Sequence, residues 1–148
     1  MIEEIYKVFE RSRLVSTDSR VITPNSVFFA LKGDNFDGNQ FVDAAFEAGC
    51  AAAVVSDTKY RGRENVFVVK DTLETLQQLA NYHRRKLNIP ILAITGTNGK
   101  TTTKELIQAV LSKKFKTLAT KGNLNNHIGV PLTLLSIPYD TEIAIVEM

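Results

Sequence analysis

The sequence predicts an α/β protein in which a small α/β domain is followed by the start of a parallel-sheet domain with a Gly-rich loop. Short apolar runs alternate with segments whose apolar residues recur at helical spacing, an order that gives mostly parallel sheets. One apolar run leads through the Gly-rich segment into an amphipathic one, which predicts strand, loop and helix in that order. The composition, 44% hydrophobic and 23% charged over 148 residues, is that of a folded protein with a core.

The first dozen residues are expected to form an amphipathic helix, since Ile2, Ile5 and Phe9 recur at helical spacing. The polar residues 16–20 predict a turn. Next we expect a buried strand over residues 27–31 and a loop rich in turn formers over 32–39. A helix over 41–48 then stops at Gly49, and two further buried strands follow over 52–55 and 66–69. This part of the chain is already an α/β unit.

A longer helix follows Asp71, which forms a capping box with Glu74, and Pro90 ends it. We place the domain boundary where this helix ends, which gives domains 1–88 and 89–148. The second domain is expected to begin with an apolar strand over residues 91–94, the Gly-rich loop over 95–102 and an amphipathic helix over 103–111. A strand over 115–119, an Asn-rich loop over 122–129 and a last buried strand over 143–146 are expected to follow. We assign the apolar face of its helix to Leu106, Ile107, Val110 and Leu111.

The charge balance excludes some classes of partner. Eighteen basic and sixteen acidic residues leave a formal charge of +2, too small to indicate binding to nucleic acid or to a membrane surface. The start of the chain lacks the pattern of a signal peptide, and no apolar run approaches membrane-spanning length, which favours the cytoplasm. The single cysteine, Cys50, is expected to be a buried thiol, and His83 a packed histidine rather than a metal ligand.

Residues 95–102, Thr-Gly-Thr-Asn-Gly-Lys-Thr-Thr, predict a loop that binds the phosphates of ATP. A Gly-rich turn that opens a helix points consecutive backbone N–H groups at a phosphate. Lys100 would reach the β- and γ-phosphate oxygens as the catalytic cation, and the Thr101 hydroxyl would bind Mg²⁺. The nucleotide-binding residues are then Gly96, Thr97, Asn98, Gly99, Lys100, Thr101 and Thr102. Because Ile94 stands where the longer phosphate-loop pattern has glycine, the match is to a shorter variant; a purely structural turn is the alternative.

The same loop resembles that of the Mur ligase family, ATP-dependent amide-forming enzymes of bacterial cell-wall synthesis. Folylpolyglutamate synthetases share the loop but lack the N-terminal domain. Residues 18–20, 27–33 and 37–41 are similar to the uridine-nucleotide-binding domain of the family members that add the third peptide residue or the final dipeptide. Residues 121–133 resemble the members that join D-alanyl-D-alanine to UDP-N-acetylmuramoyl-tripeptide.

The resemblance implies that ATP phosphorylates the carboxylate of the UDP-sugar-peptide and that the amine of the dipeptide displaces phosphate. It makes Glu147, at the end of the last strand, a Mg²⁺ ligand together with Thr101. The residues implied for the uridine diphosphate end are Ser19, Arg20, Asp37 and Gly38. Asn123, Asn125, Asn126 and His127 follow a strand on the same edge as the phosphate loop, so we expect them to line the cleft. Ordinary turn chemistry is the alternative for both groups.

Three other functions stay open: the ligase that adds the third residue, a kinase or GTPase with a phosphate loop, and a non-catalytic UDP-sugar-binding module. A GTPase would need an Asn-Lys-x-Asp segment, which the sequence lacks. Since the last apolar strand has no predicted helix after it, we expect an N-terminal fragment of the ligase that is inactive alone. The complete enzyme would be a monomer, whereas the exposed sheet edge of the fragment predicts self-association.

Overall fold

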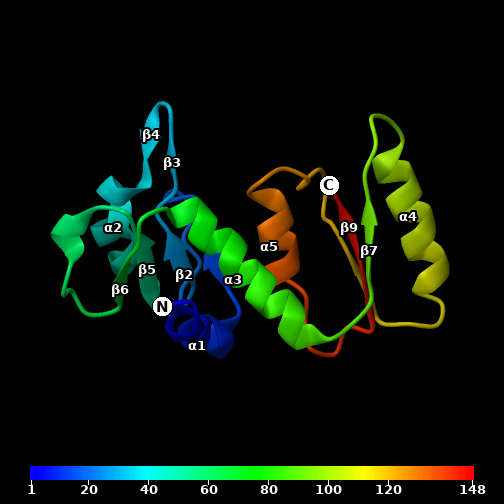
Figure 1. Ribbon diagram of the computed structural model, residues 1–148, viewed down its shortest axis with the longest axis horizontal. Coiled ribbons are helices and arrows are strands. Elements are labelled where there is room, and N and C mark those ends of the chain that lie inside the picture. Colours follow the sequence, from blue (N-terminus) through cyan, green and yellow to red (C-terminus); the bar gives the residue numbers. More distant parts are fainter. The chain divides into compact units, whose positions relative to one another are not determined.

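Two units, Met1–Leu79 and Ala80–Met148, make up the chain in a computed structural model that describes residues 1–148 (Figure 1). Each unit contains a parallel sheet and helices, which confirms the α/β class. The division falls inside helix α3, Thr72–Leu87, whose last turns belong to the second unit. The domain boundary at residues 88–89 therefore stays a prediction.

The first unit is built on a four-stranded parallel sheet in the order β1-β2-β5-β6. The strands span Val15–Ser16, Val27–Phe29, Ala52–Val55 and Val66–Val68. The two central strands, β2 and β5, are fully buried, as the sequence predicts for apolar runs inside a parallel sheet. Helix α1, Ile2–Ser12, buries Ile5, Tyr6 and Phe9, which confirms the predicted amphipathic helix.

The connection between β2 and β5 differs from the expected loop. Strands β3, Lys32–Gly33, and β4, Phe36–Asp37, form a small antiparallel hairpin. A 3-10 helix, η1, Gly38–Phe41, continues into α2, Val42–Glu47, and a second one, η2, Thr58–Tyr60, lies between β5 and β6. A Cβ atom at Gly38 would lie 2.7 Å from the carbonyl oxygen of Leu31, so the backbone can pass here only without a side chain.

The second unit holds a three-stranded parallel sheet in the order β7-β9-β8. The strands span Ile91–Ile94, Ile143–Glu147 and Thr117–Ala119. Figure 1 shows this sheet between helix α4, Lys100–Leu111, and helix α5, Gly129–Leu135. The last apolar strand, expected to be uncovered, is instead the central and most buried strand. Helix α5 was not predicted, because it follows the Asn-rich loop and contains Pro131.

The assigned apolar face of α4 is wrong in part. Leu106 and Val110 are 64% and 71% exposed. The helical period that faces the sheet runs instead through Lys104, Ile107 and Leu111, so a lysine occupies a position where an apolar residue was expected. The edge strand β7 also leaves Leu92 40% exposed.

Cys50 and His83, predicted to be a buried thiol and a packed histidine, are both buried. Cys50 is 7% exposed, and burial raises the pKa of its thiol to about 11. His83 is fully buried, its Nε2 lies 3.1 Å from the carbonyl oxygen of Ile137, and its ring meets the edge of Tyr139. None of the helices combines the length and apolar character that crossing a lipid bilayer requires.

Candidate functional site

The Gly-rich loop joins β7 to the first turn of α4, as the sequence predicts. Gly99 precedes the helix with φ +75°, and Gly96 has φ +148°, both in the region that favours glycine. No atom lies within 4 Å of a Cβ built at either position, so the loop presents open backbone. The first N–H groups of a helix have no partner within the helix, so the start of α4 suits an anion.

A cleft of about 270 Å³ lies at the start of α4. Its lining combines loop residues with the end of the central strand: Thr97, Asn98, Gly99, Lys100, Thr101, Thr102 and Glu147. All predicted nucleotide-binding residues except Gly96 thus surround one cavity. Gly96 contributes its carbonyl oxygen, which accepts a hydrogen bond of 2.8 Å from Lys100 Nζ, so the ammonium is folded back onto the loop.

Glu147 is the last residue of β9 and is only 1% exposed. Its Oε1 accepts a hydrogen bond of 2.9 Å from Asn125 Nδ2, and its Oε2 lies 3.3 Å from Lys104 Nζ. The Thr101 hydroxyl donates to both carboxylate oxygens, at 3.4 and 3.3 Å. Burial by itself raises the pKa of Glu147, but the donors Asn125, Lys104 and Thr101 together hold that pKa below its ordinary value. The carboxylate is ionised at neutral pH.

Thr101 and Glu147 fit the Mg²⁺ predicted here. Adjacent ligand oxygens around an octahedral Mg²⁺ lie about 3 Å apart, close to the separation of the Thr101 hydroxyl from the Glu147 carboxylate oxygens, 3.3 and 3.4 Å. The chain contains no cluster of three or more His, Cys, Asp or Glu side chains that could hold a metal. One carboxylate and one hydroxyl suit a Mg²⁺ that takes its other ligands from phosphates and water.

Two residues of this site were missed in the sequence. Lys104, 3% exposed, pairs with Glu147 and donates a hydrogen bond of 3.0 Å to the carbonyl oxygen of Gly122. The buried Thr120 accepts a hydrogen bond of 2.9 Å from the backbone N–H of Glu147 through its Oγ1. Lys100 and Lys104 are four residues apart, a spacing that places both on one helix face, so this spacing could have revealed Lys104. No sequence signal indicates Thr120.

The residues predicted in the Asn-rich loop make different contacts. Asn125 reaches Glu147, whereas the Oδ1 of Asn126 accepts hydrogen bonds from the backbone N–H groups of Ile128 and Gly129, at 3.1 and 2.7 Å, at the start of α5. Asn123 and His127 are exposed on the same loop. Of the four predicted residues, Asn125 is therefore the one tied to the carboxylate that lines the cleft.

The predicted residues of the first unit lie in two separate places. Arg20 forms a two-point ion pair with Asp18, through Nε to Oδ1 at 2.9 Å and Nη2 to Oδ2 at 2.7 Å, and Ser19 lies between them in the turn. The hydrogen bonds from Arg20 lower the pKa of Asp18 to about 2. The Arg20 side chain is 85% exposed, so its guanidinium remains accessible to an anion.

Asp37 ends the small hairpin, and Gly38 begins η1. Asp37 lines an open cleft of about 430 Å³ whose other lining residues come from the hairpin and η1: Lys32, Gly33, Asp34, Asn35, Phe36, Gln40 and Phe41. Hydrogen bonds from the Asn39 side chain and backbone lower the pKa of Asp37. The rings of Phe36 and Phe41 stack with their centroids 5.4 Å apart.

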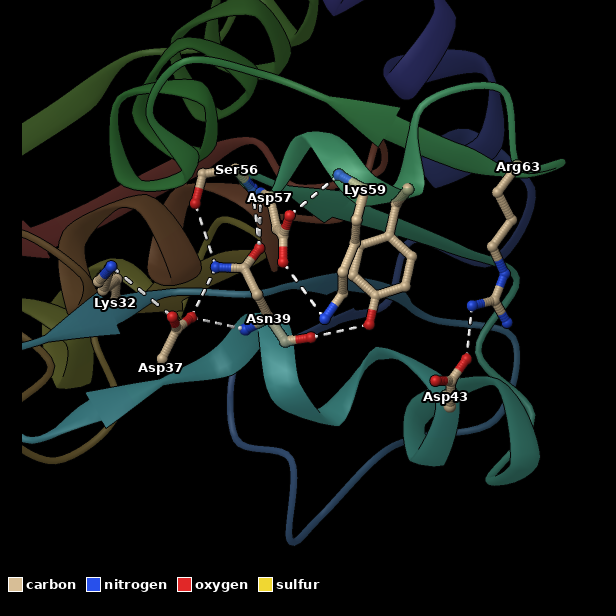
Figure 2. A network of polar contacts seen from close by, with 9 residues as sticks. Lys32, Asp37, Asn39, Asp43, Ser56, Asp57, Lys59 and Arg63 are labelled. Carbon is tan, nitrogen blue, oxygen red and sulfur yellow. Dashed lines mark hydrogen bonds and ion pairs between the residues drawn. The ribbon is translucent and has the colours of Figure 1, made fainter.

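Asn39 holds this hairpin against the end of β5 (Figure 2). Its Nδ2 donates to Asp37 Oδ1 and Ser56 Oγ, at 2.6 and 3.1 Å. Its Oδ1 accepts from the backbone N–H groups of Ser56 and Asp57, at 2.9 and 3.1 Å. The Tyr60 hydroxyl donates to its carbonyl oxygen at 3.0 Å. Every polar atom of this buried amide is paired, so Asn39 positions Asp37 rather than facing a ligand.

Comparison with known proteins finds one family in both halves of the chain. Residues 12–84 match the Mur ligase family, catalytic domain, and residues 94–148 match the Mur ligase middle domain. The UDP-N-acetylmuramoyl-tripeptide–D-alanyl-D-alanine ligase of Bacillus subtilis is 48% identical over 136 residues, which cover 90% of this chain and 30% of the relative. The chain thus spans about a third of the length of the curated relatives it matches.

Solved structures agree with this match. A crystal structure of MurF from Acinetobacter baumannii superposes with a TM-score of 0.85 at 34% identity, over 99% of this chain and 34% of the other. The MurF ligase of Thermotoga maritima, solved in complex with ADP, gives a TM-score of 0.82 at 33% identity, over 93% of this chain and 32% of the other. The order of sheet, loop and helices described above is therefore shared with these enzymes.

Proposed function

The chain belongs to the Mur ligase family, and from that premise we propose that it is part of an ATP-dependent ligase that joins D-alanyl-D-alanine to UDP-N-acetylmuramoyl-tripeptide. The observation that carries this proposal is the cleft at the start of α4, where Lys100, Thr101 and Glu147 converge. A cation, a hydroxyl and a buried carboxylate beside the backbone of a Gly-rich loop are groups that bind a nucleoside triphosphate with Mg²⁺.

In the proposed reaction, the γ-phosphoryl group of ATP passes to the terminal carboxylate of the tripeptide, and the amine of the dipeptide then forms the amide and releases phosphate. Two anions must meet in the first step, so positive charge at the phosphates lowers the barrier. Lys100 would leave the carbonyl of Gly96 for the β- and γ-phosphate oxygens. Mg²⁺ held by Thr101 and Glu147 would neutralise further phosphate charge.

The loop residues Gly96 to Thr102 hold and orient the nucleotide in this proposal. Gly96 and Gly99 leave space beside the backbone, so phosphate oxygens could approach its N–H groups closely. Asn125, which bonds to Glu147, and its neighbours Asn123, Asn126 and His127 would line the side where the tripeptide carboxylate arrives.

The uridine diphosphate end is assigned to the first unit. Arg20 supports this assignment with a guanidinium that Asp18 orients but leaves exposed. Asp37 supports it by lining a cleft that the stacked rings of Phe36 and Phe41 also line. Ser19 and Gly38 complete the proposed set. Since ATP is the proposed co-substrate, the cytoplasm is the proposed location.

A coupled assay tests this function in the complete protein that contains the chain. ATP, UDP-N-acetylmuramoyl-tripeptide and D-alanyl-D-alanine are expected to give the pentapeptide product with one phosphate per amide formed. The control omits the dipeptide, which should stop amide formation. Product formation from UDP-N-acetylmuramoyl-dipeptide and a single amino acid, and none from the tripeptide and D-alanyl-D-alanine, would instead favour the ligase that adds the third residue.

A further inference from the structure

Lys104 is a buried cation that the proposed reaction does not use. Its side chain is 3% exposed, and its Nζ contacts Glu147 Oε2 at 3.3 Å and the carbonyl oxygen of Gly122 at 3.0 Å. Taking an ammonium and a carboxylate out of water is costly, and an apolar pair of similar volume often gives equal stability. The charge at position 104 therefore calls for an explanation other than stability.

Lys104 and the metal-site residues share one carboxylate. Thr101 lies three residues before Lys104 on α4, so both side chains reach Glu147 from the same helix face. Oε1 of Glu147 accepts from Asn125, and Oε2 faces Lys104. Both carboxylate oxygens thus have donors within the chain.

A divalent cation at Glu147 would stand within a few ångströms of the Lys104 ammonium. Like charges this close repel strongly in a site shielded from water. The negative phosphates of a nucleotide would offset that repulsion, because they would enter the same cleft that Glu147 lines. Lys104 should therefore weaken the binding of a divalent cation alone more than the binding of a cation together with phosphates.

Resting on the nucleotide site proposed above, we infer that Lys104 is an internal counter-ion of Glu147. Lys104 pairs with the carboxylate when no ligand is bound and lowers the affinity of the site for a free divalent cation. It allows a cation to bind together with nucleotide phosphates. Lys104 acts through Glu147 and does not touch the reacting atoms, so it is a positioning residue. Its bond to Gly122 holds the Asn-rich loop beside the same carboxylate.

Binding of Mn²⁺ to the nucleotide-free protein, followed by electron paramagnetic resonance, tests this inference. Lys104→Met and Lys104→Gln remove the charge, and the glutamine keeps a donor for Gly122. Both are expected to bind Mn²⁺ about tenfold more tightly than the unaltered protein, because the repulsion is gone. Lys104→Arg and the control Lys113→Met, at an exposed lysine just after α4, are expected to leave the affinity unchanged.

Equal or weaker Mn²⁺ binding in folded Lys104→Met and Lys104→Gln overturns the inference. In the double variant Lys104→Met/Glu147→Gln, the gained Mn²⁺ affinity should disappear; its persistence means that Mn²⁺ binds elsewhere and also overturns the inference. A parallel ADP titration separates the two proposals. If the unaltered protein does not bind ADP with Mg²⁺ but the charge-removing variants gain Mn²⁺ affinity, the nucleotide site fails and the counter-ion role stands.

Discussion

Glu147 shows how one residue can be buried and ionised at once. Its backbone N–H is held by Thr120, and its carboxylate meets an ammonium, an amide and a hydroxyl from α4 and the Asn-rich loop. These donors offset the loss of hydration, which would otherwise favour the protonated form. The sequence indicated Glu147 by resemblance, whereas Lys104 was overlooked because a lysine on an amphipathic helix is usually expected on the solvent side.

Removing the charge of Lys104 alone should destabilise the fold. Lys104→Met leaves the Glu147 carboxylate buried without its cation, and breaking a buried ion pair in this way costs about 3–5 kcal/mol. The double variant Lys104→Met/Glu147→Gln removes both charges and is expected to recover most of that loss. Urea unfolding of both variants at pH 7 measures the difference. Equal losses in the two would contradict the assigned ion pair.

Asp18 provides a pH prediction for the first unit. Its pKa of about 2, against an ordinary value of 3.8, comes from hydrogen bonds with Arg20. Because the folded pKa is depressed, this interaction contributes stability above pH 3.8 and loses it as the pH falls toward 2. Carboxyl chemical shifts followed by NMR should titrate near 2 and return toward 3.8 in Arg20→Ala. Lys59→Ala, which removes a different exposed ion pair, is the matched control.

At the scale of elements, long periodic segments and continuous apolar runs were predictable, and the two-residue strands were not. Helices α1 and α3 are long enough for their helical period to be visible, and strands β2, β5 and β9 lie in continuous apolar runs. Strand β1 and the β3–β4 hairpin have two residues per strand, so pairing with a neighbour defines them and local pattern does not. The sheet-facing side of α4 was misassigned because that side carries Lys104.

The β3–β4 hairpin and η1 depend on Asn39. Asn39→Ala removes four side-chain hydrogen bonds and leaves the partly buried N–H groups of Ser56 and Asp57 without their partner, so we expect a loss of stability of about 2 kcal/mol. Thermal unfolding measures it. Asn35→Ala, at an exposed position of the hairpin, is the control and should change little. A stability equal to that of the control would show that the Asn39 network is dispensable.

The whole chain combines two α/β units, each with polar residues that the sequence singled out, and the family match extends through both. In the second unit, the Gly-rich loop, α4 and the end of β9 form one cleft, and we propose that this cleft binds the phosphates of ATP with Mg²⁺. The loop was predictable because its residues are contiguous. Asn125 was expected in the cleft, but its contact with Glu147 and the contact of Lys104 with Glu147 could not be predicted, because α4 and the Asn-rich loop meet at Glu147 only after folding.

Calorimetric titration of the protein with ADP and Mg²⁺ tests this claim most directly. Lys100→Ala is expected to weaken ADP binding by about tenfold or more, since a charge-assisted contact to phosphate is lost. Lys113→Ala, which alters an exposed lysine outside the cleft, should bind ADP like the unaltered protein. Binding of ADP that is equally tight in Lys100→Ala and in the control would contradict the account.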